Sequence, residues 1–244
     1  MTMQYYDYET KVQYSDLGED GFLSQVGTLR LMQEAACEAS ASVDCAPGRL
    51  IERMGVGWIL CGWKLKKGKK VAWGEPLTVR TWPRRMDIHF SDRDFLVTDA
   101  AGETVAAATS RWLLLDVRTG RVTRVTEELA AHYEIWDHKA VEGEIPTGGR
   151  SPEDARETFA YTALGRDLDT FHHVNNLHYL ELGREALPEE VRPLPLSTVE
   201  ILYKRQIKRG ERVRFFYALV DGKHQVEIRD DEGKKTHALL WFCE

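Results

Sequence analysis

The sequence predicts an α+β fold in which one plan, a long helix followed by antiparallel strands, occurs twice. Three observations predict it. Apolar residues recur at helical spacing in one segment of each half, runs rich in Val, Leu, Phe and Trp follow each segment, and glycine-containing turns separate the runs. The halves also share residues at one spacing of 151 positions: Asp16-Leu17 matches Asp167-Leu168, and Glu34-Ala35 matches Glu185-Ala186.

The first half is expected to open with a short strand at 10–14. A helix is expected at 23–41, because Val26, Leu29 and Met32 follow helical spacing and the alanines after them favour a helix. Glycine-containing turns then separate four expected strands. Their ranges are 58–66, 76–82, 93–98 and 104–116.

The second half repeats this order. A strand is expected at 158–163 and an amphipathic helix at 175–186. Four more strands should follow, at 199–207, 212–219, 225–230 and 236–242.

Between the halves, glycine and proline content predicts a linker. We expect an N-terminal domain at 1–137, a linker at 138–156 and a C-terminal domain at 157–244, with a short helix at 129–138 before the linker. One helix wrapped by a strongly curved antiparallel sheet is the hotdog plan, so the sequence predicts two tandem hotdog domains. Small residues would let both helices approach their sheets closely: Ala35, Ala36, Ala39, Gly183 and Ala186.

Composition excludes several classes of protein. With 244 residues, 43% hydrophobic and 30% charged, the chain is an ordinary globular protein. A net charge of −6 disfavours a nucleic-acid binder, and no apolar run approaches the length of a membrane span. The N-terminus lacks the basic start and apolar core of a signal peptide, so a cytoplasmic location is expected.

The four cysteines, Cys37, Cys45, Cys61 and Cys243, form no CxxC pair and show no metal-ligand spacing. We therefore expect no metal site, and nothing in the sequence indicates a cofactor.

The polar segment 167–179 carries the densest chemistry in the chain, with two carboxylates, three imidazoles and two amides just before and within the second helix. A positioned carboxylate or imidazole can activate water against a reactive ester without a covalent nucleophile. Amides at a helix N-terminus can stabilise the oxyanion that forms. Asp169 and His173 are therefore the candidate catalytic residues, and Asn175 or Asn176 is expected to cap the helix.

The order Asp169, His173-Val-Asn-Asn, Tyr179 and then Glu185 resembles the signature of hotdog-fold acyl thioesterases, and most closely the acyl-acyl-carrier-protein (acyl-ACP) thioesterases of plants and bacteria. The resemblance covers roughly residues 10–242. It implies that Asp169 orients or deprotonates water and that His173 is its partner near the thioester. Possible supporting residues are Asn175, Asn176, Glu185 and Gln206, with Glu185 expected to act structurally through a bond to the sheet.

The sequence departs from the plant pattern at three positions. Phe171 stands where the plant enzymes usually have Asn between this Asp and His. Gln206-Ile207 follows Tyr203-Lys-Arg where those enzymes carry Glu-Cys. A cysteine nucleophile is thus excluded there, and Gln206 could orient water but cannot accept its proton.

The first helix has no His-Val-Asn-Asn equivalent, so the N-terminal half is expected to form the acyl pocket. Its candidate walls, each of which could equally be plain core, are Leu29, Met32, Trp58, Leu60 and Trp112. An acidic carrier protein or the phosphates of coenzyme A would be attracted to basic clusters. The carrier-binding candidates are Lys204, Arg205, Lys208 and Arg209.

The leading hypothesis is a thioesterase that hydrolyses fatty acyl-ACP, with acyl carrier protein as its partner. An acyl-CoA thioesterase and a non-catalytic acyl-binding hotdog protein are the alternatives, and a hotdog dehydratase is a weaker one. By resemblance, a homodimer is plausible.

Overall fold

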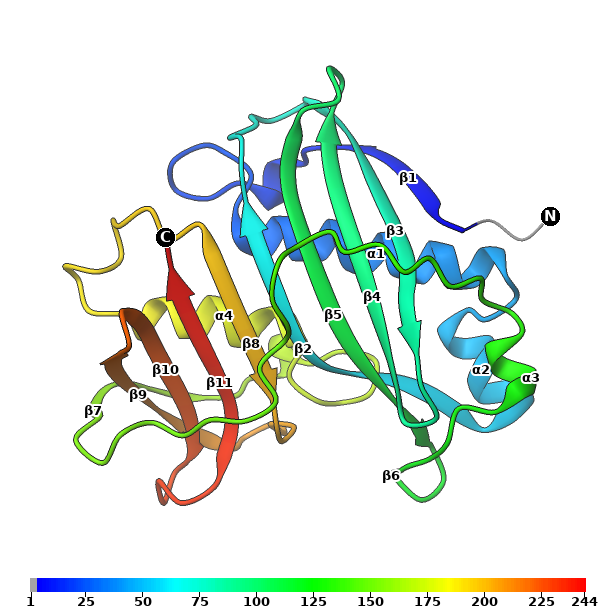
Figure 1. Cartoon of the computed structure of the whole chain (residues 1–244). Coiled ribbons are helices and arrows are strands. Elements are labelled where there is room, and N and C mark those ends of the chain that lie inside the picture. The colour runs from blue at the N-terminus through cyan, green and yellow to red at the C-terminus, as the bar shows by residue number, and fades with distance from the viewer. Residues whose placement is uncertain (1–3) are drawn as a thin grey trace. The chain divides into compact units, whose positions relative to one another are not determined.

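The computed structural model describes residues 4–244, which form two compact units (Figure 1). Unit 1 comprises residues 4–61 and 65–144, and unit 2 comprises residues 62–64 and 145–244. Each unit has one long helix and an antiparallel sheet, so the predicted α+β fold is confirmed.

Unit 1 contains a sheet in the order β1-β3-β4-β5-β2, with the short strand β6 paired to β5. The helix α1 (Gln25–Ser42) packs against β3 and β1, and Leu29, Met32 and Ala35 on its sheet-facing side are fully buried. The strands are β1 (Tyr6–Lys11), β2 (Val56–Lys67), β3 (Pro76–Met86), β4 (Phe90–Asp99), β5 (Thr104–Asp116) and β6 (Arg121–Val122); two short helices, α2 (Pro47–Met54) and α3 (Glu127–Ala130), complete the unit.

Unit 2 repeats the plan on a smaller scale, with strand order β8-β11-β10-β9-β7. The helix α4 (Asn176–Glu185) packs against β11. A Cβ on Gly183 would lie 2.7 Å from Leu240 Cδ2, so this close approach requires glycine. The strands are β7 (Arg156–Thr162), β8 (Thr198–Tyr203), β9 (Arg212–Val220), β10 (Lys223–Asp230) and β11 (Thr236–Cys243).

Three expected elements differ from the structure. The first strand ends at Lys11 instead of residue 14, because a 3-10 turn closed by the Gln13 N–H and the Asp16 carboxylate occupies the next residues. The strand expected at 199–207 ends at Tyr203, where the N–H groups of Lys204 and Arg205 both donate to His237 O. Of the helix expected at 129–138, only the first two residues are helical, and they form the end of α3 (Glu127–Ala130). The helix α2 was not predicted from the sequence.

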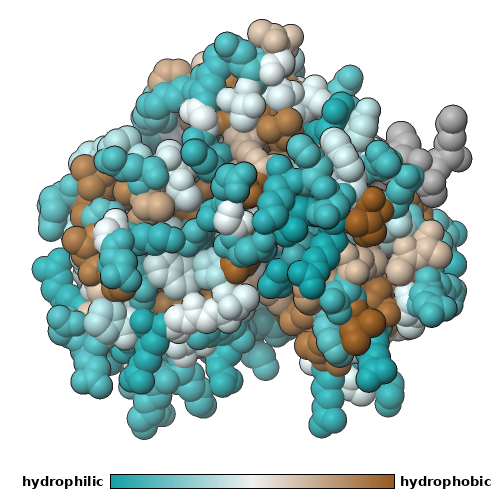
Figure 2. Space-filling view, in the orientation of Figure 1, coloured by the Kyte–Doolittle hydropathy of each residue, from teal (hydrophilic) through white to brown (hydrophobic). Residues whose placement is uncertain are grey.

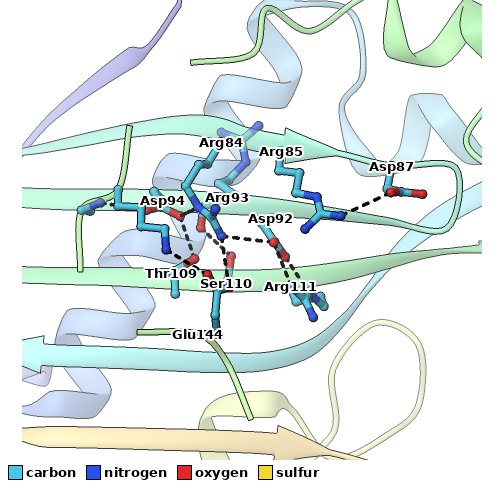
Figure 3. Close-up of polar contacts among 12 residues, drawn as sticks. Arg84, Arg85, Asp87, Asp92, Arg93, Asp94, Thr109, Ser110, Arg111 and Glu144 are labelled. Carbon is cyan, nitrogen blue, oxygen red and sulfur yellow. Dashed lines mark hydrogen bonds and ion pairs between the residues drawn. The ribbon is translucent and has the colours of Figure 1, made fainter. Parts of the chain in front are cut away.

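A buried ion network lies on the face of the unit 1 sheet opposite α1 (Figure 3). Asp92 binds Arg111 through two hydrogen bonds, of 2.7 and 2.9 Å. Arg84 Nε and Nη2 lie 3.1 and 3.2 Å from Asp94 Oδ1 and Asp92 Oδ2. Arg84 is the extra residue of a β-bulge in β3, and this bulge places its side chain between the two aspartates.

The expected linker is held to the units at both of its ends. The Ala140 N–H donates to Asp94 Oδ2 at 2.8 Å, and Trp82 Nε1 donates to His138 O, both within unit 1. Within unit 2, the Ser151 N–H donates to the buried carboxylate of Glu227 at 3.0 Å.

The surface shown in Figure 2 is mostly hydrophilic, with apolar residues in small separate areas. Among residues 4–244, no helix is long and apolar enough to cross a membrane.

Candidate active site

The candidate site begins with a loop that leads from β7 into α4. A 3-10 turn (Gly165–Asp167) ends at a buried aspartate. The Asp167 carboxylate accepts hydrogen bonds from the Leu164 N–H at 2.7 Å and from the Tyr161 hydroxyl at 3.0 Å. The Asp167 carbonyl accepts from the Asn175 N–H at 2.8 Å. Residues 168–174 therefore form a short loop whose two ends are joined at Asp167.

Asp169 is held in this loop by the backbone around it. Its Oδ1 accepts from the N–H groups of Phe171 at 2.8 Å and His173 at 3.4 Å, and its own N–H donates to His173 O at 2.9 Å. Oδ2 has no hydrogen-bond partner in the part of the chain that the structure describes. One carboxylate oxygen thus fixes the orientation while the other is free to accept a proton or a water.

His173 is half-buried, and its Nδ1 is buried without a hydrogen-bond partner among residues 4–244. Such a nitrogen is costly unless a ligand or water completes it. The other two imidazoles of the segment differ. His178 pairs with Glu181, and this hydrogen bond raises the pKa of His178, while His172 is exposed.

The N-terminus of α4 lies directly after this loop. Asn175 is the N-cap, and its side chain accepts a hydrogen bond from the Leu177 N–H at 3.0 Å. It is thus one of the two asparagines that the sequence offered as caps. Asn176 is the first helical residue, and its carbonyl accepts from the Tyr203 hydroxyl at 3.0 Å. First-turn amides lack helical partners and carry the positive end of the helix dipole. The Leu177 N–H is bound by the Asn175 side chain and the His178 N–H by Asn175 O, so the Asn176 N–H remains to stabilise an oxyanion.

Tyr179 fastens the site to the segment after β8. Its hydroxyl donates to Arg205 O at 3.2 Å and accepts from the Ile207 N–H at 3.0 Å. Burial raises the pKa of Tyr179, so the hydroxyl remains protonated and keeps both bonds. The Val174 N–H also donates to Ile207 O at 2.9 Å. Two independent contacts therefore hold the loop and helix against residues 205–207.

The other expected supporting residues lie in different places. Glu185 is exposed at the far end of α4, about 15 Å along the axis from Asn175. Its carboxylate lies 3.7 Å from Arg192, so the expected bond to the sheet is wrong. Gln206 is exposed in the segment that Tyr179 holds, and its carbonyl lies 3.2 Å from His237 Nδ1.

Of the five expected wall residues, three are buried in unit 1, and Trp58 and Trp112 are partly buried. Leu29, Met32 and Leu60 are fully or almost fully buried. Trp58 packs on the cluster around Leu114, and Trp112 Nε1 donates to Ser110 Oγ at 2.7 Å.

Two of the four expected carrier-binding cations share a groove with two lysines that sequence reasoning missed. Lys204 and Arg205 line it together with Lys234 and Lys235 of the turn between β10 and β11. Lys208 and Arg209 lie in a separate turn, where the Lys208 N–H donates to the Glu211 carboxylate.

Unit 1 contains the same loop without the candidate catalytic side chains. At the common spacing of 151 positions, the Gly18 N–H donates to Phe22 O and the Ser24 N–H to Asp16 O, as their counterparts do in unit 2. The Leu23 N–H donates to Val71 O as the Val174 N–H does to Ile207 O, although these two acceptors do not follow that spacing. Gly18 replaces Asp169, and Phe22 replaces His173. The internal repeat is therefore structural, and only the unit 2 copy carries an acid and an imidazole.

His172 has a positive φ of 62°, and its counterpart Gly21 has a φ of 78°. This left-handed conformation strains any residue with a Cβ. We expect His172→Gly to raise the free energy of unfolding by about 0.5–1 kcal/mol, since the side chain is exposed and few contacts are lost. Denaturant unfolding checks this, with Gly21→His as the matched change expected to destabilise. A stability loss in His172→Gly would show that the imidazole makes contacts that its exposure conceals.

Among residues 4–244, no group of three or more His, Cys, Asp or Glu side chains could hold a metal ion.

Comparison with known proteins assigns the family. The model for the acyl-ACP thioesterase N-terminal domain matches residues 3–133, and that for the acyl-ACP thioesterase C-terminal domain matches residues 151–239. The chain therefore belongs to the acyl-ACP thioesterase family, which confirms the resemblance of its motifs.

Named relatives share modest identity with this chain. Oleoyl-acyl carrier protein thioesterase 2 of Arabidopsis thaliana is 25% identical over 199 residues, which are 75% of this chain and 54% of the relative. Dodecanoyl-[acyl-carrier-protein] hydrolase of Cinnamomum camphora is 26% identical over 203 residues, which are 78% of this chain and 53% of the relative. The chain spans about half the length of the curated relatives it matches.

Two solved structures share the fold. An acyl-ACP thioesterase from Bacteroides thetaiotaomicron superposes with a TM-score of 0.87 at 19% identity, covering 98% of this chain and 97% of that one. The 12:0-ACP thioesterase from Umbellularia californica has a TM-score of 0.83 at 21% identity, covering 99% and 97%. The predicted tandem hotdog architecture is thus confirmed at the level of fold.

Proposed function

We propose that this chain hydrolyses fatty acyl-ACP to a free fatty acid and the carrier protein. The observation that carries the proposal is the loop at the N-terminus of α4. There Asp169 has one carboxylate oxygen fixed and one free, and His173, four residues later, has a buried nitrogen without a partner among residues 4–244. Membership of the acyl-ACP thioesterase family supports the same reaction.

In the proposed mechanism, the oxygen of a water molecule attacks the thioester carbonyl carbon while Asp169 Oδ2 accepts a proton from that water. The carbonyl oxygen becomes an oxyanion, and the Asn176 N–H in the first turn of α4 donates to it. When the intermediate collapses, the C–S bond breaks and the departing sulfur takes the proton from Asp169. His173 orients water or thioester through its unpartnered nitrogen. One water and one thioester give one carboxylic acid and one thiol.

The positions where this chain departs from the plant pattern, Phe171 and Gln206, supply no second acid for this step, and the Asp167 carboxylate is already bound by Leu164 and Tyr161. Gln206 can donate and accept hydrogen bonds but cannot take a proton, and Phe171 presents an exposed ring. The proposal therefore assigns base catalysis to a single carboxylate, that of Asp169. Asn175, Asn176 and Tyr179 position the helix end and the segment beside it.

The two halves have different roles in this proposal. Residues 157–244 form the catalytic domain, residues 1–137 form the domain that contributes the acyl pocket, and 138–156 is the linker. The missing acid and imidazole at Gly18 and Phe22 support this division. The five wall candidates, the cytoplasmic location and the homodimer stay predictions.

The basic groove of unit 2 is the proposed docking site for the acidic carrier. We expect Lys234→Glu/Lys235→Glu to raise KM for acyl-ACP at least about tenfold while kcat changes little, because peripheral charge mainly steers association. Steady-state kinetics at low and high salt check this. Lys11→Glu/Lys66→Glu, which makes the same charge change at two exposed lysines of unit 1, is the control. Equal KM increases in both variants would show a net-charge effect and remove the groove from the proposal.

Acyl-CoA is the alternative substrate, since its phosphates suit the same groove. Hydrolysis of dodecanoyl-ACP and dodecanoyl-CoA under identical conditions separates the two. The proposal expects a higher kcat/KM for the carrier thioester. Hydrolysis of neither thioester would leave the non-catalytic acyl-binding alternative.

A further inference from the structure

Unit 1 contains a cavity of about 300 Å³ beside the C-terminal half of α1. Residues from β1, β3 and β4 and from segment 131–134 after α3 complete its wall. The loop equivalent to the candidate active site lies at the opposite end of α1, before Ser24. This cavity therefore belongs to neither copy of the repeated loop.

Arg93 contributes a buried cation to this cavity. Its side chain belongs to β4, and the residue is 7% exposed. Nη1 donates to Thr81 Oγ1 at 3.2 Å, and no carboxylate of the described residues lies within ion-pair distance. Its neighbours Asp92 and Asp94 point to the other face of the sheet because side chains alternate along a strand, and there they bind Arg111 and Arg84 (Figure 3).

The charge of Arg93 is not compensated by an ion pair with any of the described residues. Burial lowers the pKa of Arg93, while Tyr133 and Cys37 raise it. Desolvation raises the pKa of both of these groups above the ordinary values, so they are uncharged near neutral pH. A buried cation without an anion is costly for the fold, and an anionic ligand would remove that cost.

Part of the remaining wall is apolar and suits an apolar body. Ala39, Val43 and Pro83 present aliphatic groups, and the ring of Tyr5 adds an aromatic surface. Glu134 is the one acidic residue among the lining residues that the structure describes, and it forms no ion pair with Arg93. The wall therefore combines apolar groups with polar side chains such as Ser42 and His132 and with the buried cation. A concave site with apolar surface and a few placed polar groups is typical of small-molecule binding.

We propose that this cavity binds a carboxylate carried on an apolar chain, with the guanidinium of Arg93 as its partner. Guanidinium matches a carboxylate through two parallel N–H···O bonds. Two ligands share this chemistry: a free fatty acid, and an acyl chain that bears a second carboxylate at its far end. Decanoate binding at this site does not depend on the hydrolysis proposed for unit 2, whereas the comparison of thioester substrates below rests on that proposed function.

The test is isothermal titration calorimetry of the whole chain with decanoate below its micelle concentration and with decan-1-ol. We expect decanoate to bind at least about tenfold more tightly than the alcohol, as for a charge-assisted hydrogen bond out of water. In Arg93→Met the preference should vanish, whereas the control Arg85→Met, an exposed arginine on β3 outside the cavity, should retain it. Equal binding of decanoate and decanol by the natural chain overturns the proposal without any variant.

Arg93→Met should fold, because it replaces an uncompensated buried charge by an apolar side chain of similar length. Should it fail to fold, Thr81→Val, which removes the partner of the guanidinium, provides the second variant and should change decanoate affinity but not decanol affinity.

To separate the two ligand sources, thioesters of dodecanoic and dodecanedioic acid are compared as substrates. An Arg93-dependent lower KM for the dioic thioester identifies the distal carboxylate, and equal KM values with tight decanoate binding identify the free acid.

Discussion

Replacing Asp169 by alanine is expected to lower kcat for acyl-ACP hydrolysis by roughly 10²–10⁴-fold, the usual contribution of a positioned general base. The free Oδ2 is the group that would accept the proton of water, and neither Phe171 nor Gln206 can replace it. Asp169 also accepts hydrogen bonds from two backbone N–H groups. The alanine substitution removes these bonds as well, and a looser loop would itself lower kcat. Steady-state kinetics must therefore be accompanied by a measurement of thermal stability.

Asp169→Asn separates the two effects. Its amide oxygen can still accept from the Phe171 N–H, while its ability to take a proton is lost. We expect a loss of kcat close to that of alanine with little change in Tm. Asp20→Asn is the matched control, since Asp20 Oδ1 accepts from the Phe22 N–H in the equivalent loop of unit 1. An Asp169→Asn enzyme with full activity would show that the carboxylate is not the base.

Arg84→Met is expected to lower the free energy of unfolding by about 3–5 kcal/mol at neutral pH, as when one member of a buried ion pair is removed. The change leaves Asp94 buried with only Thr109 and the Ala140 N–H as partners. Denaturant unfolding measures it. The exposed Arg85→Met should cost less than about 1 kcal/mol, since Arg85 lies at the surface, where it pairs with Asp87 at 3.4 Å and lies over the Phe90 ring.

The pH dependence of this loss identifies its cause. Burial already raises the pKa of Asp94 above its ordinary value, and loss of Arg84 should raise it further. A raised carboxyl pKa means that the ionised form is disfavoured in the fold, so the penalty is present above the folded pKa and fades as the pH falls below it. Arg84→Met should therefore be less destabilised in acid. Arg84→Met/Asp94→Asn should recover much of the loss at neutral pH, and no recovery would show that packing dominates.

The repeated helix and strand plan could be predicted because its signals are local. The strand expected at 104–116 has those bounds in the structure, since a mostly apolar run lies between two turns that each contain a glycine. The end of β8 at Tyr203 could not be predicted in this way. It depends on Lys204 and Arg205 both binding His237 O, a contact between segments far apart in the sequence.

In the candidate site, too, local features could be predicted from the sequence and long-range contacts could not. Asp169 and His173 could be selected because their spacing and the following helix lie in one short segment. The contribution of Tyr179 depends on its contacts with Arg205 and Ile207, which only the folded chain reveals. The strained backbone at His172 did have a signal in the sequence, because the 151-residue repeat aligns it with Gly21.

The measurement that tests the central claim most directly is the release of free fatty acid from dodecanoyl-ACP by the natural chain and by Asp169→Asn, side by side. The natural chain should release fatty acid and carrier thiol in equal amounts, at a rate that the variant lowers at least about a hundredfold with its Tm unchanged. Release no faster than the uncatalysed reaction, or equal rates in the two proteins, would contradict a thioesterase that uses Asp169 as its base.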